Sequence, residues 1–152
     1  MAYEEVLRMG IWNFYRALTR RLLAWNLANV ALGVVLLKKG TPWWRGFGSQ
    51  NMGWAVINFA IAIFGGRATE KRRAQLLKPD EPVVVRKEAH NLRLVLWVNA
   101  VLDVLYMVGG HSLARTLGKK KSSLSGMGWG IVFQGALLLA FDVIHALLVP
   151  EQ

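Results

Sequence analysis

The sequence of 152 residues contains no cysteine. This absence excludes disulfide-generating and quinone-coupled thiol enzymes, which need redox-active cysteine pairs. It also excludes zinc and iron–sulfur sites that use cysteine ligands. The three histidines do not have a metalloenzyme spacing, and no GxSxG motif marks a serine nucleophile. We therefore expect a protein that is not an enzyme and that holds no metal.

Acidic residues are also scarce, with 9 Asp and Glu against 19 Lys and Arg, which gives a net charge of +10. The basic residues lie between apolar runs and not on one soluble face, so we expect no nucleic-acid binding. Hydrophobic residues make up 54% of the chain even before glycine is counted. A soluble domain of this size cannot bury so much apolar surface. The sequence therefore predicts a protein of the lipid bilayer.

Four apolar runs account for the hydrophobic excess. They cover residues 22–37, 50–66, 94–110 and 126–149. Each is close to the roughly 17–25 residues that a helix needs to cross a bilayer. The first run is the shortest, and Lys38 and Lys39 can extend it by snorkelling. We expect one all-α membrane domain over residues 1–152, a bundle of four transmembrane helices.

Two segments outside these runs have features of their own. Residues 3–20 place apolar side chains at helical spacing, which predicts an amphipathic helix that lies on the cytoplasmic leaflet or continues into the first span. A helix that docks a partner is the alternative. Residues 67–90 form a predicted cytoplasmic basic loop, whose first part can extend the second helix before Pro79 and Pro82 end it.

The distribution of Lys and Arg predicts the orientation. Twelve precede the first run or lie between the second and third, and seven lie in the other two connections. By the positive-inside rule, both termini face the cytoplasm, and we expect a multi-pass protein of a bacterial inner membrane. Lipid headgroups are expected to meet four arginines of the more basic side, Arg20, Arg21, Arg72 and Arg73.

An internal duplication is suggested by two matches. Met52-Gly53-Trp54 in the second run recurs as Met127-Gly128-Trp129 in the fourth, and Asn29 in the first run corresponds to Asn99 in the third. Since each half holds two spans, the halves would be parallel two-helix repeats. Coincidence between helix starts rich in Gly and Trp is the alternative.

Small residues are concentrated at the start of the fourth run. They are Gly126, Gly128, Gly130 and Gly135. Small residues let membrane helices approach closely, so we interpret these glycines as helix-packing positions. A homodimer contact or a flat ligand is the alternative.

Polar side chains inside the runs form the candidate site. They are Asn29, Asn58, Asn99, Asp103, Gln134, Asp142 and His145. In lipid such groups must turn inward and find partners. They either tie the helices together by hydrogen bonds or bind a cation, a proton or a polar ligand head. We predict no cofactor; a lipid could be bound, and a pigment or haem with His145 as axial ligand is the weaker alternative.

The segment Gly126-Met127-Gly128-Trp129-Gly130-Ile131-Val132-Phe133-Gln134-Gly135, followed by Phe141-Asp142-Val143-Ile144-His145-Ala146, supports a family resemblance. It resembles the last span of an uncharacterised family of small bacterial four-helix membrane proteins. The stretch from Arg45-Gly46-Phe47-Gly48 to Asn58 is similar to the second span of that family. The resemblance implies the fold and a membrane location, and it implies no activity.

Together these features predict a non-catalytic membrane protein. We expect an accessory or scaffolding subunit that packs beside another membrane protein or beside a second copy of itself. The alternative is a small proton- or ligand-coupled carrier that uses Asp103 and Asp142 as an intramembrane carboxylate site.

Overall fold

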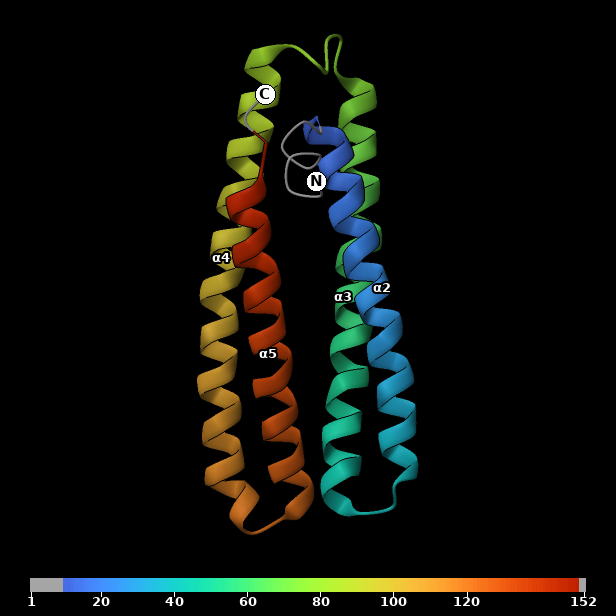
Figure 1. The fold of residues 1–152 in the computed structure, drawn as a ribbon, viewed down its shortest axis with the longest axis vertical. Coiled ribbons are helices and arrows are strands. Elements are labelled where there is room, and N and C mark those ends of the chain that lie inside the picture. Colours follow the sequence, from blue (N-terminus) through green and yellow to red (C-terminus); the bar gives the residue numbers. More distant parts are fainter. Residues whose placement is uncertain (1–9, 151–152) are drawn as a thin grey trace, which may run out of the picture.

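The computed structural model describes residues 10–150, which form four long helices side by side (Figure 1). The elements are α2 (Ile11–Lys38), α3 (Pro42–Gln75), α4 (Pro82–Arg115), the 3-10 turn η1 (Leu117–Lys119) and α5 (Ser122–Leu148). Each of the four long helices is long and apolar enough to cross a membrane. The predicted all-α class with four potential spans is therefore confirmed.

The helices begin where the local sequence favours a helix start. Pro42 and Pro82 occupy the first turns of α3 and α4, where a missing backbone N–H costs nothing. Thr41 caps α3, because its hydroxyl accepts a hydrogen bond of 3.4 Å from the Trp44 backbone N–H. Gly40 has a φ of +82°, which a residue with a side chain rarely adopts, and this permits the short turn between α2 and α3.

The helices extend well beyond the apolar runs. The first part of the predicted loop 67–90 extends α3 to Gln75, as the sequence allowed, and residues 76–81 connect the two helices. Residues 82–90 were expected to be loop and instead begin α4. The residues after the second run are mostly Ala, Glu, Lys, Arg and Gln, which are strong helix formers, so the end of the hydrophobic pattern does not end the helix.

The predicted N-terminal helix is described in part. Residues 11–20 are the first turns of α2 and run without a break into the first apolar run. Of the two arrangements expected for this segment, continuation into the span holds for these residues. Residues 3–9 lie outside the described part of the chain.

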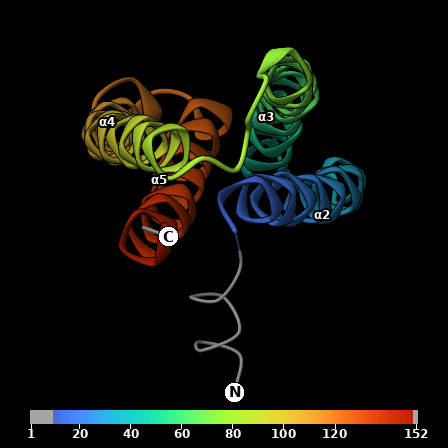
Figure 2. The ribbon, with the colours of Figure 1, turned by 90° about the horizontal axis from the view of Figure 1, so that it is seen from above.

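The bundle consists of two antiparallel hairpins, α2–α3 and α4–α5, which meet mainly where α3 contacts α5 (Figure 2). The start of α2, the end of α5 and the connection between α3 and α4 lie at the same end of the molecule (Figure 1). We call this the terminal end. The connections between the helices of each hairpin lie at the opposite end.

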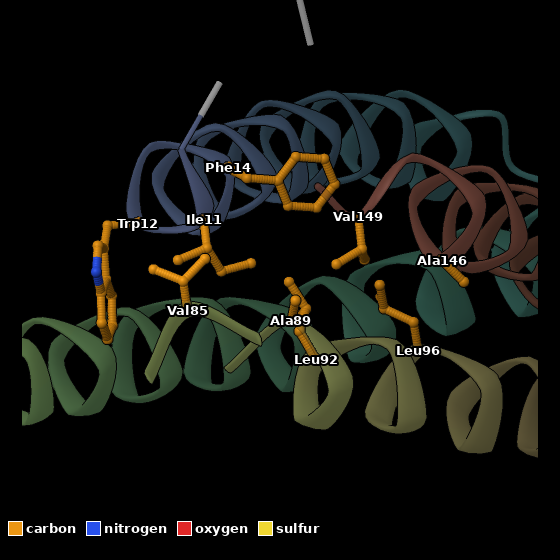
Figure 3. Close-up of a cluster of buried hydrophobic side chains, with 9 residues drawn as sticks. All are labelled: Ile11, Trp12, Phe14, Val85, Ala89, Leu92, Leu96, Ala146 and Val149. Atoms are coloured by element: carbon orange, nitrogen blue, oxygen red, sulfur yellow. The ribbon is translucent and has the colours of Figure 1, made fainter. Parts of the chain in front are cut away.

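A cluster of buried apolar side chains joins the helices at the terminal end (Figure 3). It comprises Ile11, Trp12, Phe14, Val85, Ala89, Leu92, Leu96, Ala146 and Val149, from α2, α4 and the end of α5. The Trp12 indole N–H also donates a hydrogen bond of 3.0 Å to the Pro79 carbonyl. The first turn of α2 is therefore held against the connection between the hairpins as well as against α4 and α5.

The outer surface of the helices is apolar. Val56, Phe64 and Leu147 expose 67–70% of their area. These side chains come from helices of both hairpins, and further exposed Val, Ile and Leu lie between them. Since a soluble protein rarely leaves such large apolar patches uncovered, this surface matches a hydrocarbon environment.

The two hairpins differ in the residues that face each other. In the first hairpin Gly33 lies against Met52, so the predicted duplication would place Asp103 against Met127 in the second. Instead the Asp103 carbonyl lies beside Gly135, two turns further along α5. The helix contacts in the two hairpins therefore do not correspond in the way the duplication predicts, and the duplication stays a prediction from the sequence.

An ion pair connects α3 to α4 at the terminal end. The Arg72 guanidinium donates hydrogen bonds of 2.9 and 2.6 Å to the two carboxylate oxygens of Glu88. The Glu88 side chain is 8% exposed and that of Arg72 is 46% exposed. The Tyr15 hydroxyl of α2 donates a weaker hydrogen bond of 3.4 Å to the same carboxylate.

Replacing one partner of this pair should destabilise the bundle more than replacing both. We expect Arg72→Met to cost about 1–3 kcal/mol, because it leaves a buried carboxylate with only the weak Tyr15 contact. The double variant R72M/E88M should recover part of that loss, since no buried charge remains. Thermal unfolding in mild detergent measures both, with R86M at an exposed position of α4 as control. Equal losses of stability in the single and double variants would show that the unpaired Glu88 carboxylate is not what destabilises R72M.

Candidate functional site

The predicted polar residues fall into three groups, of which the first is a closed hydrogen-bond network. Asn29 of α2 and Gln134 of α5 exchange two amide hydrogen bonds of 3.2 and 2.8 Å. Gln134 also donates to the side-chain oxygen of Asn51, whose own amide donates to the Phe47 carbonyl at 2.8 Å. Asn29, Asn51 and Gln134 are at most 1% exposed. The network ties α2, α3 and α5 together and leaves none of its amide groups unpaired.

Asn51 belongs to this set, although it was not among the residues predicted from the sequence. Asn51 lies seven residues before Asn58 on α3, which puts both on the same face of the helix. This seven-residue spacing was the feature of the sequence that could have identified Asn51. The structure separates the two, because Asn51 faces Gln134 of α5 and Asn58 lies one heptad closer to the terminal end.

His145 belongs to a second group. Its Nδ1 atom lies 2.6 Å from the Phe141 carbonyl, and its Nε2 atom lies 3.0 Å from Nη1 of Arg21 on α2. Since a carbonyl can only accept, Nδ1 donates and Nε2 accepts from the guanidinium. Both ring nitrogens thus have protein partners, which leaves neither free as an axial ligand in this arrangement. Through this hydrogen bond Arg21 of α2 contacts α5.

The third group lines a groove between α3 and α4, which we call the α3–α4 groove. Its cavity has a volume of about 310 Å³, and its polar lining includes Asn58, Asn99, Asp103 and Asp142. Side chains of α2 and α5 also contribute to its lining. Ile57 and Ile61 of α3 and Val95 of α4 also line it and expose more than half of their area, so the groove borders the apolar outer surface of the bundle.

Two buried carboxyl groups belong to this groove. Asp103 of α4 and Asp142 of α5 are 4% and 7% exposed, line the same cavity and are close enough to interact electrostatically. Within residues 10–150, neither Oδ2 of Asp103 nor the amide nitrogen of Asn58 has a hydrogen-bond partner. Two neighbouring carboxylates in apolar surroundings cannot both remain charged without a proton or a cationic group between them. The carboxyl pair therefore favours binding of a proton or a cationic group in the groove.

The four predicted packing glycines lie where α5 approaches its two neighbours. A side chain at Gly126 or Gly130 would meet the backbone or side chains of α3, at Trp43, Phe47 and Gln50. A side chain at Gly128 or Gly135 would meet α4, at the Gly110 and Asp103 carbonyls. The two pairs thus occupy the two contact faces of α5.

The four arginines expected at lipid headgroups have different surroundings. Arg21 contacts His145, Arg72 pairs with Glu88, and Arg73 lies 4.0 Å from the Asp80 carboxylate and over the Trp12 ring. For the exposed Arg20, the described residues provide no such partner. Within residues 10–150, no group of three or more His, Asp or Glu side chains could hold a metal ion.

The fold and these sites define a class: a four-helix protein whose helices could each span a membrane and whose polar residues lie inside the bundle. The chain belongs to a family of unknown function, DUF6992, whose model matches residues 21–143. The match covers most of all four helices. No curated protein and no solved structure matches the chain.

Proposed function

We propose that this protein is a non-catalytic accessory subunit of a membrane assembly, and that its α3–α4 groove binds a transmembrane helix of the partner. A basic side chain of that helix meets Asp103 and Asp142. The observation that carries the proposal is the pair of buried carboxyl groups that line one groove bordered by exposed apolar side chains.

The polar atoms of the groove favour a charged occupant. In hydrocarbon, the unpartnered Asp103 oxygen would cost free energy, because no water is present to satisfy it. A lysine or arginine side chain supplies both the positive charge for the carboxyl pair and hydrogen-bond donors for this oxygen. A purely apolar helix leaves the oxygen unpaired.

The shape of the groove favours a helix. Its lining on α4 extends from Leu92 to Tyr106, which at 1.5 Å per residue corresponds to roughly 21 Å. This is most of the roughly 30 Å thickness of a bilayer core. A helix can lie along such a groove, with apolar side chains against its walls and one basic side chain at the carboxyl pair.

A second copy of this chain does not suit the groove. The four apolar runs contain no Lys or Arg, so no helix of a second copy can place such a side chain at the depth of Asp103. The proposed partner is therefore a different membrane protein that carries a basic residue within a span.

A proton- or ligand-coupled carrier is the second candidate function, and the buried carboxyl pair is the observation in its favour. A carrier also needs a path to the other side of the membrane. The lining of the groove ends near Trp54 and Tyr106. Toward the opposite end, Gly126 and Gly128 bring α5 close to α3 and α4. This closed packing is why we rank the carrier second.

We further propose a bacterial inner membrane as the location, with both termini in the cytoplasm. Residues 10–150 place eleven Lys and Arg at the terminal end and seven at the opposite end. This asymmetry supports the orientation by the positive-inside rule.

The proposal is tested with synthetic transmembrane helices that differ in one central residue. The full chain is reconstituted in phosphatidylcholine vesicles with leucine-rich helices that carry Lys, Leu or Glu at the centre. Energy transfer between labelled partners measures binding. We expect the Lys helix to bind at least about tenfold more tightly than the others, consistent with a buried charge pair. D103N/D142N should abolish this preference, and D80N, at a 74% exposed side chain, should preserve it.

Two outcomes would overturn the accessory proposal. Equal binding of the Lys and Leu helices would show that the carboxyl pair does not select a cationic partner. Proton or cation flux into the same vesicles that is lost in D103N/D142N would favour the carrier instead.

A further inference from the structure

A second cavity lies between α2 and α3 at the terminal end, next to the α3–α4 groove, with which it shares part of its lining. It has a volume of about 450 Å³, and its lining includes charged side chains as well as apolar ones such as Leu23, Ala62 and Ile63. We propose that this cavity binds an anionic phospholipid, with the phosphate against Arg20 and Arg67. This inference does not depend on the proposed partner helix.

The two arginines come from different helices but lie at the same level of the bundle. A Cβ atom added at Gly66 of α3 would lie 3.3 Å from the Thr19 methyl group of α2, so these two residues are directly opposite. Arg20 and Arg67 each follow one of them in the sequence and both line the cavity. One phosphate between the helices can therefore be reached by both guanidinium groups, which suit its geometry.

Both arginines are available for a ligand. Arg20 and Arg67 are exposed, and within residues 10–150 no carboxylate forms an ion pair with either. The other charges of the cavity largely balance each other, because Arg16 lies 3.9 Å from Glu70 and also donates to the Asn13 side chain. Among residues 10–150, two positive charges of the cavity thus have no compensating carboxylate.

The position of the cavity fits a lipid better than a soluble anion. Leu23 is nearly one turn from Arg20, and Ile63 one turn from Arg67, both on the side of the apolar runs. Ile63 is 40% exposed and Phe64 beside it is 67% exposed. The arginines therefore lie where the apolar surface ends, so that a phosphate can meet them while an acyl chain follows Leu23 and Ile63.

This site changes the headgroup assignment made from the sequence. Arg21, Arg72 and Arg73 contact His145, Glu88 and Asp80 within the protein. Arg20 alone of the expected four lines the cavity, and Arg67 joins it there. Sequence proximity of basic residues could not show which of them lack an internal partner.

Native mass spectrometry of the full chain, stripped of lipid in detergent, tests the site with phosphatidylglycerol and phosphatidylcholine as probes. We expect phosphatidylglycerol to bind preferentially, and R20Q/R67Q to weaken its binding roughly tenfold or more, since each arginine near a membrane surface contributes separately. R86Q is the matched control, because Arg86 is an exposed arginine of α4 at the same end and outside the cavity. Far-UV circular dichroism checks that each variant is folded.

Three results would overturn the inference. Equal binding of the two lipids would exclude selection of an anionic headgroup. An unchanged affinity in folded R20Q/R67Q would place the lipid elsewhere. Displacement of phosphatidylglycerol by millimolar inorganic phosphate would show that the acyl chain contributes nothing and that the cavity is a free-anion site.

Discussion

Gly126→Ala and Gly128→Ala are each expected to destabilise the bundle by about 1–3 kcal/mol, the usual cost of overpacking a close contact. The new methyl group at position 126 would collide with the Trp43 carbonyl of α3, and the one at position 128 with the Gly110 carbonyl of α4. Backbone atoms cannot move aside as a flexible side chain can. The helices would therefore have to separate, and the contacts next to the glycine would weaken with them.

The control for this prediction is Gly53→Ala on α3. An added Cβ at Gly53 meets no atom within 4 Å, so we expect no loss and a small gain from the higher helix propensity of alanine. Unfolding free energies measured by denaturant titration in mixed micelles compare the three variants. If Gly53→Ala destabilises as much as the other two, close approach of the helices is not the reason that glycine occupies positions 126 and 128.

Gln134→Leu is expected to cost about 2 kcal/mol, because it removes three interhelical hydrogen bonds that average about 0.6 kcal/mol each in a membrane protein. Gln134 is fully buried and contacts Asn29 of α2 and Asn51 of α3. Leucine fills a similar space, so the loss reports the unpaired amides and not a cavity. The same unfolding titration measures it, with F133L at the neighbouring exposed position as control.

A triple variant separates the hydrogen bonds from the packing. In N29L/N51L/Q134L no buried amide of the network remains, and replacing all partners by apolar groups of similar size can be nearly neutral. We expect the triple variant to be more stable than Q134L alone. If the three substitutions simply add, the amides act independently and the network described above does not hold the helices together.

The sequence was sufficient to predict the number of helices, because four apolar runs are a strong signal that depends on composition alone. The extension of α3 through the polar residues 67–75 was also predictable, since Arg, Lys, Glu and Ala are compatible with a helix that leaves the apolar region. The sequence was insufficient to predict where α4 begins. Pro82 was expected to break a helix and instead begins one, as proline does at a first turn.

The members of the polar sites were predictable, and their grouping was not. An amide or carboxyl inside an apolar run is conspicuous, so Asn29, Gln134, Asp103 and Asp142 were all found. Which of them meet depends on the neighbours of α5, and the sequence does not specify that α5 lies between α3 and α4. The same reason explains why Asn51 was missed, since its partner Gln134 is 83 residues away.

The amide network has a consequence for how the chain is made. The α2–α3 hairpin leaves the ribosome first, carrying Asn29 and Asn51, whereas their common partner Gln134 is on the last helix. Until translation reaches α5, the Asn29 amide and the side-chain oxygen of Asn51 lack this partner. Biogenesis of the bundle is therefore completed only when its final segment is inserted, and a chain truncated before Gln134 would lack the group that locks the earlier helices together.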